Sequence, residues 1–210
     1  MIVFHTANTP NGHKVAIALQ ELGMPHEVVP VDLGRGEQHH PDFVALSPNH
    51  KIPVIVDRRD DGSGDQVVFE SCAILIHLAD QAGRLLSRDP ARRSETLQWL
   101  FLQTSSIGPM LGQLWWFRHG TSTRNEQALE RYRREARRLY GVVEQRLATS
   151  PYIAGDAYSI ADIAMFPWLR TGEELGLDIA DWPHVQAWLH KIGERPAVQR
   201  GLALLQAQAA

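Results

Sequence analysis

Polar side chains that could hold an anion lie near the start of the chain, in the segment Thr9-Pro10-Asn11-Gly12. An apolar stretch over 2–4 precedes them and is typical of a buried strand, and a helical pattern follows over 13–22. Because a helix N-terminus presents unpaired N–H groups and the positive end of the helix dipole, this junction could bind an anion. The Thr9 hydroxyl and the Asn11 amide could donate hydrogen bonds to a thiolate. The segment has no cysteine, so such a sulfur would belong to a ligand. The competing interpretation is a plain helix cap, since Pro is common at a helix start.

A second polar pair, Glu70-Ser71, lies between a strand pattern and a helix pattern. Ser71 is a good N-cap residue, and capping alone would account for it. In the functional alternative, the Ser71 hydroxyl and the N–H groups after it bind a ligand carboxylate, and Glu70 binds the ammonium group of the same ligand.

The pair Ile52-Pro53 follows Lys51 and leads into a strand pattern. Only about one X-Pro bond in twenty is cis in folded proteins, so the residues alone favour a trans bond. A cis bond would turn the backbone of Ile52 outward, where an extended peptide could pair with it as an added strand.

Strand and helix patterns alternate over the N-terminal part of the chain. The predicted strands are 2–4, 27–31, 54–56 and 66–69, and the predicted helices are 13–22, 71–82 and a short helix or loop over 38–46. A turn over 60–65 joins the last two strands, which form a hairpin. This order predicts an α/β domain over 1–83.

The remainder of the chain has helix patterns and no convincing strand. The predicted helices are 91–117, 125–147, 159–171 and 185–195. Pro109 should kink the first of these helices, Ser159-Ile160-Ala161-Asp162 resembles a capping box at the start of the third, and 203–210 should fray. We therefore expect an all-α domain over 90–210, after a linker over 83–90.

Composition excludes several classes of function. The chain has 210 residues, a net charge of −3 and one cysteine, Cys72. The lack of a basic surplus argues against a nucleic-acid partner, and no apolar run is long enough to span a membrane. A single cysteine excludes intramolecular disulfides and cysteine-based zinc sites, and the histidines lack metal-site spacing. Without a secretory signal, we expect a cytoplasmic protein that binds no metal.

Other candidate residues have simpler interpretations. Cys72 could be reactive at a helix start, but we expect a small packed residue. Trp115, Trp116 and Phe117 could line an apolar cleft, but core packing is the expectation for them. Arg131 belongs to an arginine-rich segment whose charges should be solvated and partly offset by glutamates.

The joint order of these features resembles the cytosolic glutathione transferase superfamily over essentially the whole chain. Several motifs narrow the resemblance to the nu class, the bacterial disulfide-bond oxidoreductases related to the yeast regulator Ure2: Thr9-Pro10-Asn11-Gly12-His13-Lys14, Val31-Asp32-Leu33, Ser47-Pro48-Asn49, Leu97-Gln98-Trp99-Leu100-Phe101 and Gly108-Pro109-Met110-Leu111-Gly112-Gln113. The resemblance implies a thioredoxin-like domain followed by a helical bundle, a homodimer and bound glutathione, reduced or oxidised.

The resemblance also assigns roles to residues of this chain. Thr9 and Asn11 would face the glutathione sulfur, and Ile52, before a cis Pro53, would pair with the cysteinyl backbone. Glu70 and Ser71 would hold the γ-glutamyl end. The remaining assignments are Gln38, Asn49 and Lys51 near the glycyl carboxylate, and Arg131 as a ligand contact.

One departure lies in the first strand, where several transferase classes carry an activating Tyr and this chain reads Phe4-His5. His5 could replace that Tyr, but the missing Tyr weakens the expectation of strong conjugating activity. Our leading hypothesis is reduction of small disulfides through bound glutathione. The alternatives are conjugation of glutathione to small electrophiles, and a glutathione-binding regulator without catalysis.

Overall fold

The computed structural model describes residues 1–59 and 64–206. These residues form two compact units, one of which contains Met1–Leu86 together with Arg195 and helix α9 (Pro196–Gln206), and the other Ser87–Glu194. The break after residue 86 lies inside the expected linker. The C-terminal helix, however, groups with the first unit and not with the helical domain expected over 90–210.

The first unit is built on a four-stranded sheet with the order β2-β1-β3-β4. Its strands are β1 (Ile2–Thr6), β2 (His26–Pro30), β3 (Val54–Asp57) and β4 (Gln66–Phe69). Strand β1 pairs parallel with β2 and antiparallel with β3, and β3 pairs antiparallel with β4. The predicted hairpin is confirmed, although part of its turn, 60–63, lies outside the described residues.

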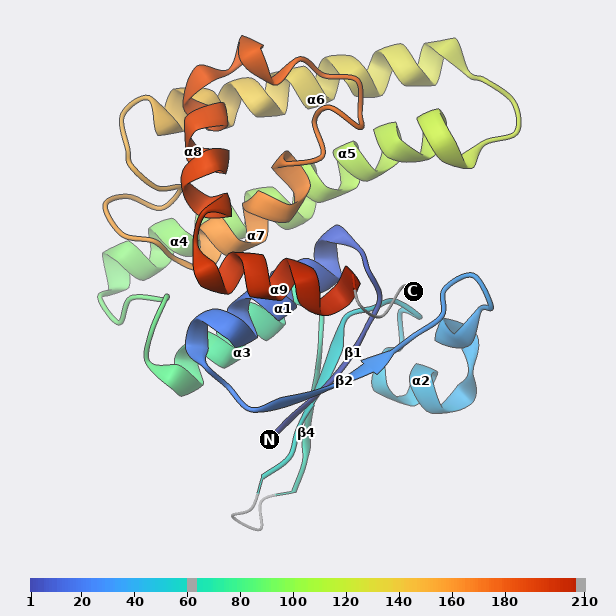
Figure 1. The fold of residues 1–210 in the computed structure, drawn as a ribbon, viewed down its shortest axis with the longest axis vertical. Helices are drawn as coiled ribbons and strands as arrows, with labels where there is room; N and C mark the ends of the chain where they lie inside the picture. Colours follow the sequence, from blue (N-terminus) through green and yellow to red (C-terminus); the bar gives the residue numbers. More distant parts are fainter. Residues whose placement is uncertain (60–63, 207–210) are drawn as a thin grey trace. The chain divides into compact units, whose positions relative to one another are not determined.

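Helices α1 (Pro10–Leu22) and α3 (Ser71–Ala82) pack together on one face of the sheet (Figure 1). The 3-10 turn η1 (Glu37–His39) and helix α2 (Pro41–Leu46) lie apart from them. Phe43 of α2 packs against Val31 and Val54 in a separate apolar cluster. This arrangement is thioredoxin-like, and it brings the N-termini of α1 and α3 to the same region of the unit.

Helix α9, which the sequence patterns did not predict, lies alongside α1 (Figure 1). A Cβ at Gly201 would lie 2.7 Å from the Cα of Ile17, so glycine is what permits this close approach. Leu205 is buried, with 1% of its surface exposed. The expected fraying of 203–210 is therefore wrong as far as Gln206, because burial against α1 orders the helix; residues 207–210 lie outside the described part.

The second unit consists of helices. They are α4 (Pro90–Leu102), η2 (Gln103–Ile107), α5 (Gly108–Trp115), η3 (Trp116–Gly120), α6 (Glu126–Leu147), α7 (Ile160–Leu169), η4 (Ile179–Asp181) and α8 (Pro183–Gly193). Within the described residues of this unit, extended pairing is limited to the isolated bridge between Tyr152 and Gly155.

The irregularity expected at Pro109 takes the form of a π-helical segment, η2, directly before it. The N–H of Gly108 donates to the carbonyl of Gln103, five residues earlier. Because proline has no N–H and crowds the preceding turn, widening that turn by one residue accommodates Pro109 without ending the helix. The predicted helix over 91–117 is thus two α-helices joined by this wider turn.

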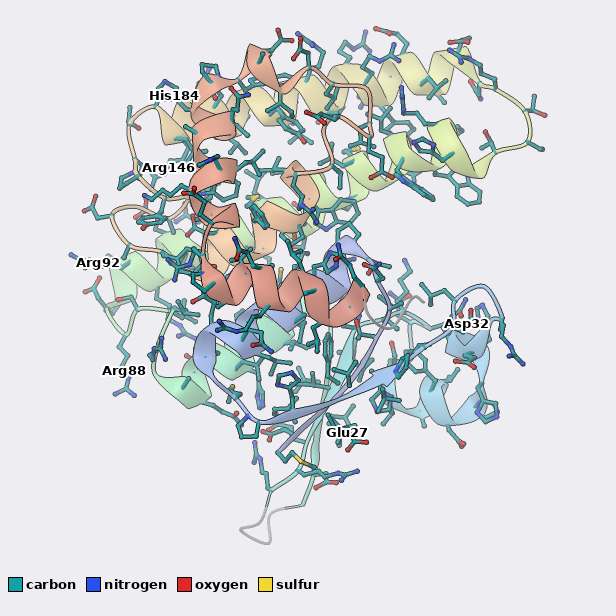
Figure 2. The ribbon with its side chains drawn as sticks, in the orientation of Figure 1. Glu27, Asp32, Arg88, Arg92, Arg146 and His184 are labelled. Carbon is teal, nitrogen blue, oxygen red and sulfur yellow. The ribbon has the colours of Figure 1, made fainter. Side chains whose placement is uncertain are left out.

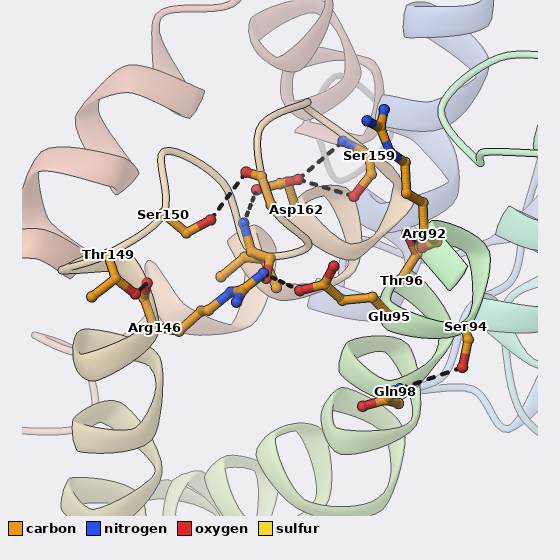
Figure 3. Close-up of polar contacts among 12 residues, drawn as sticks. Arg92, Ser94, Glu95, Thr96, Gln98, Arg146, Thr149, Ser150, Ser159 and Asp162 are labelled. Carbon is orange, nitrogen blue, oxygen red and sulfur yellow. Dashed lines mark hydrogen bonds and ion pairs between the residues drawn. The ribbon is translucent and has the colours of Figure 1, made fainter. Parts of the chain in front are cut away.

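The start of α7 is capped by hydrogen bonds between Ser159 and Asp162, which Figure 3 shows. Ser159 and Asp162 form the predicted capping box, which is confirmed. The Asp162 carboxylate accepts from the backbone N–H and hydroxyl of Ser159, at 3.0 and 3.1 Å, and from the Ile153 N–H and the Trp188 indole, both at 3.0 Å. This buried carboxylate therefore satisfies four donors and ties α8 to the start of α7.

Candidate functional site

A small cavity in the first unit, about 50 Å³ in volume, brings together most of the predicted site residues. Its walls are formed by Asn11, Ser47, Asn49, Lys51, Ile52, Pro53, Phe69, Glu70 and Ser71. These residues come from the start of α1, the loop between α2 and β3, and the junction of β4 with α3. They are widely separated in the sequence, and the fold makes them neighbours.

Thr9 is the N-cap of α1, as the cap interpretation predicts. Its hydroxyl oxygen accepts a hydrogen bond from the Gly12 N–H at 3.2 Å. A Cβ at Gly12 would lie 2.3 Å from the Ala7 carbonyl oxygen, so the tight turn into the helix requires glycine. Thr9 does not line the cavity, but a hydroxyl that accepts one hydrogen bond can still donate its own proton.

The start of α3 differs from the expected cap. Glu70, not Ser71, is the N-cap residue, and its side chain makes no capping hydrogen bond. Its backbone has φ 68° and ψ 114°, a conformation that costs a non-glycine residue on the order of 1–3 kcal/mol. Ser71 is the first helical residue, and its hydroxyl accepts a hydrogen bond from Lys14 instead of capping the helix. The start of α3 thus lies beside the cavity without a side-chain cap.

The Ile52-Pro53 bond is cis. The preference for trans drawn from the residues alone is wrong here, and the cis bond implied by the family resemblance is confirmed. Ser47 fixes the loop before this bond, because its hydroxyl donates a hydrogen bond to the Lys51 carbonyl at 2.9 Å. The backbone of Ile52 makes no hydrogen bond to another residue in the described part of the chain.

Lys14 is a residue of this site that the sequence analysis missed. It is 1% exposed, and its ammonium group lies 3.2 Å from the Ser71 hydroxyl and 4.0 Å from the Cys72 sulfur. Burial lowers the pKa of Lys14 to about 8, although Cys72 and Glu70 oppose this shift. The available signal was a lysine inside a helix whose next five residues, 15–19, are all apolar.

Cys72 is buried, as expected for a packed residue. Burial raises the pKa of its thiol, and the nearby Lys14 ammonium only partly opposes that effect. The thiol is therefore protonated near neutral pH and is a poor nucleophile.

His5 lies in a different cavity from Asn11 and Ser71. That cavity, about 690 Å³, is also lined by Val31, Arg35, His39 and Phe43, among others. The His5 ring meets Phe43 edge-on, with 6.5 Å between ring centroids, and burial lowers the pKa of His5 against the opposing charge of Glu27. The structure therefore does not bring His5 together with the residues that we expect to face a sulfur.

Gln38 and Arg131 do not line the small cavity. Gln38 lies in η1, where its Nε2 is 3.3 Å from the His39 ring. The loop before η1 is shaped by Asp32, labelled in Figure 2, whose carboxylate accepts from the Arg35 N–H at 3.0 Å. Arg131 belongs to α6 in the second unit and pairs with Glu135 at 3.6 Å, as expected for a solvated, partly offset charge.

The aromatic residues at the end of α5 lie on the surface. Trp115 and Trp116 are 42% and 51% exposed, so the expectation of core packing is wrong for both. Trp115 instead donates to the Glu174 carboxylate at 2.6 Å, and Phe117 stacks on Tyr132. A polar partner for the indole accounts for its exposed position.

In the described part of the chain, no cluster of three or more His, Cys, Asp or Glu side chains could hold a metal ion. Over the same residues, no helix is long and apolar enough to cross a membrane.

Two family models match the chain. The model for the glutathione S-transferase N-terminal domain matches residues 9–81, and the model for the C-terminal domain matches residues 99–196. The chain is 45% identical to the disulfide-bond oxidoreductase YfcG of Escherichia coli, over 99% of this chain and 96% of that protein. It is 34% identical to the transcriptional regulator URE2 of Saccharomyces cerevisiae, over 95% of this chain and 67% of that protein.

Solved structures give the same result. A glutathione transferase family member from Pseudomonas fluorescens, with two glutathione molecules bound, has a TM-score of 0.90 and 44% identity, covering 96% of this chain and 92% of the other. A glutathione transferase from Pseudomonas putida, with one glutathione disulfide per subunit, has a TM-score of 0.89 and 40% identity, covering 96% and 90%. The chain therefore belongs to the glutathione S-transferase superfamily, in the group that includes YfcG and the Ure2 proteins.

Proposed function

We propose that this protein binds glutathione with its γ-glutamyl end at the small cavity, beside Glu70 and Ser71, and uses it to reduce small disulfides. The observation that carries the proposal is the start of α3, which lies beside the cavity without a side-chain cap, with Glu70 and Ser71 at its edge. A γ-glutamyl group carries one carboxylate and one ammonium group on the same carbon. The Ser71 hydroxyl and the helix N–H groups suit the carboxylate, and the Glu70 carboxylate suits the ammonium group.

The unpaired backbone of Ile52 supports the next part of the proposal. Its N–H and C=O are available to pair with the cysteinyl residue of glutathione as a short added strand. This pairing directs the sulfur toward the start of α1. There the Thr9 hydroxyl, the Asn11 amide and the helix dipole would stabilise a thiolate.

The proposed reaction is two successive thiol–disulfide exchanges. The bound glutathione thiolate attacks one sulfur of the disulfide, forming a mixed disulfide and releasing the other sulfur as a thiolate. A second glutathione thiolate then attacks the glutathione sulfur of the mixed disulfide, which releases the second product thiolate and leaves glutathione disulfide. The buried, protonated Cys72 takes no part.

The names of two relatives and the ligands bound in two related structures support this reaction. YfcG and YghU of Escherichia coli are both named disulfide-bond oxidoreductases. The Pseudomonas fluorescens relative holds two glutathione molecules, and the Pseudomonas putida relative holds glutathione disulfide. The two exchanges together consume two glutathiones, and glutathione disulfide is their product.

The experiment is glutathione-dependent reduction of 2-hydroxyethyl disulfide, run beside conjugation of 1-chloro-2,4-dinitrobenzene on the same preparation. We expect clear reductase activity and poor conjugation. Strong conjugation with weak reduction would replace the proposal with an ordinary transferase. Glutathione binding without either activity would favour a regulator, as the name of the yeast relative suggests.

The remaining assignments complete the proposal. We assign Gln38, Asn49 and Lys51 to the glycyl carboxylate and Arg131 to a further ligand contact. We also propose a homodimer, which sedimentation equilibrium would test, and a cytoplasmic location. Charge-removing substitutions at Lys51 and Arg131 should weaken glutathione binding if these assignments are correct.

A further inference from the structure

Beneath Ser71 lies a buried cation for which the proposed reaction has no role. Lys14 is 1% exposed, and the cost of burying an ammonium group is large unless other groups compensate it. Replacing it with an apolar side chain of similar length would remove that cost. The Lys14 ammonium lies 3.2 Å from the Ser71 hydroxyl, at the edge of the cavity, and this position points to a role in ligand binding.

We propose that Lys14 is a positioning residue that orients the Ser71 hydroxyl toward the ligand carboxylate and supplies the positive charge behind it. This inference rests on the proposed binding of glutathione at Ser71. It adds a residue that does not itself line the cavity and makes the affinity of the site dependent on one buried proton.

The protonation state of Lys14 limits where the Ser71 hydroxyl proton can point. A protonated lysine can only donate, so while Lys14 donates to the Ser71 oxygen, the Ser71 proton must point elsewhere. The Cys72 sulfur is one acceptor within reach of the Ser71 hydroxyl. A carboxylate in the cavity, which Ser71 lines, would be a much stronger acceptor for that proton. A neutral lysine amine can accept, so deprotonation allows the Ser71 proton to turn inward, away from the ligand.

The charges around Lys14 give the direction of the pH dependence. From the start of α3, the Glu70 carboxylate favours the protonated form of Lys14, as would Cys72 once its thiol is ionised. On the α9 side, Arg195 pairs with Glu21 and Arg200 with Gln20, toward the other end of α1. Since burial lowers the pKa of Lys14 to about 8, deprotonation occurs within an accessible range of pH.

The test uses S-methylglutathione, which has no thiol to titrate, with affinity measured by calorimetry for wild type and Lys14→Met. At pH 7 we expect the variant to bind about tenfold more weakly, the usual size of a lost charged hydrogen bond. At pH 9 the ratio should fall to about twofold, because most wild-type Lys14 is then neutral. Titration of the ligand's own amine cancels in this ratio.

Lys191→Met is the matched control, because it removes a lysine charge from the second unit, where Lys191 contacts the Tyr152 ring. It should bind as wild type does at both pH values. Equal affinities of wild type and Lys14→Met at both pH values would overturn the inference while leaving glutathione binding intact. Failure of wild type to bind at all would instead overturn the proposed function.

If Lys14→Met does not fold, the same affinities are measured on Lys14→Gln, and proton uptake on ligand binding is measured on wild type and on Lys14→Gln. Uptake is measured at pH 8.5 from binding heats in buffers of different ionisation enthalpy. We expect wild type to take up about half a proton more than Lys14→Gln, as follows from a tenfold preference for protonated Lys14, because uptake by the ligand's own amine is common to both proteins. Equal uptake by the two proteins would contradict the inference.

Discussion

Two helix starts in this protein, those of α3 and α7, use the same kinds of residue for different ends. Each has a serine at its start, Ser159 as the N-cap of α7 and Ser71 as the first residue of α3, and a buried charged side chain against that serine. At α7, the charge is Asp162, whose carboxylate satisfies four donors of the protein itself. At α3, the charge is Lys14, and the N-cap residue Glu70 makes no capping hydrogen bond and has φ 68°.

The difference teaches how a structural helix start can be distinguished from a binding one. A start that is capped by the protein's own side chains contributes stability. A start that is uncapped, has a strained N-cap and borders a cavity keeps its donors available. Substitutions at α7 should therefore lower stability, whereas those at α3 should lower ligand affinity without lowering stability.

The largest expected effect is at α7. Asp162→Ala removes the shared acceptor and leaves the Ser159, Ile153 and Trp188 donors buried without it. We expect the free energy of unfolding to fall by about 4 kcal/mol. Urea denaturation measures this loss. Asp178, an exposed N-cap residue, supplies the control, because Asp178→Ala should cost only about 1 kcal/mol. Equal losses in the two variants would contradict the role given to Asp162.

At α3, removal of the buried Lys14 charge should raise the free energy of unfolding, where the α7 substitution lowers it. The folded-state pKa of Lys14, about 8, is below the ordinary value of 10.5, so the unfolded chain binds more protons between these values. Protonation of Lys14 therefore costs stability at neutral pH, and this cost is relieved as the pH rises from 8 toward 10.5. Lys14→Met should raise the free energy of unfolding at pH 7 by about 2 kcal/mol.

The same denaturation experiment at pH 7, 8.5 and 9.5 checks the sign. The advantage of Lys14→Met should shrink as the pH rises, because wild-type Lys14 loses its charge. An advantage that grows with pH, or a variant less stable than wild type at pH 7, would show that Lys14 stabilises the fold.

The start of α1 lies between these two cases, because Thr9 caps the helix and can still donate its hydroxyl proton. We expect Thr9→Ala to lower kcat for disulfide reduction about tenfold, since it removes one hydrogen-bond donor to a developing anion. The affinity for S-methylglutathione should change by no more than about twofold.

Thr9→Ser keeps the hydroxyl and is the control for the Thr9 substitution. It should retain most of the wild-type kcat. Unchanged activity in both Thr9→Ala and Asn11→Ala would refute the assignment of these side chains to the thiolate.

Much of the fold could be predicted from the sequence, because its elements follow local patterns. The apolar spacing over 71–82 predicted α3 with the observed bounds, Ser71–Ala82, and Ser159 to Asp162 predicted the cap of α7. Helix α9 could not be predicted in this way, because its order depends on Gly201 and Leu205 packing against a helix far away in the sequence.

The candidate site could be predicted only in part. The residue types at Asn11, Ile52, Glu70 and Ser71 indicated it, and the fold brings them to one cavity. The positive φ of Glu70 and the contact of Lys14 with Ser71 depend on tertiary packing between α1 and α3, which no local pattern encodes.

The most direct test of the comparison is the pair Glu70→Gly and Ser159→Gly, with unfolding free energy and S-methylglutathione affinity measured on both. Glycine relieves the strain at φ 68°, so Glu70→Gly should gain about 1 kcal/mol of stability and lose at least about tenfold in affinity. Ser159→Gly should lose about 0.5 kcal/mol and keep its affinity. A Glu70→Gly protein that is less stable than wild type, or that binds as tightly, would contradict the account.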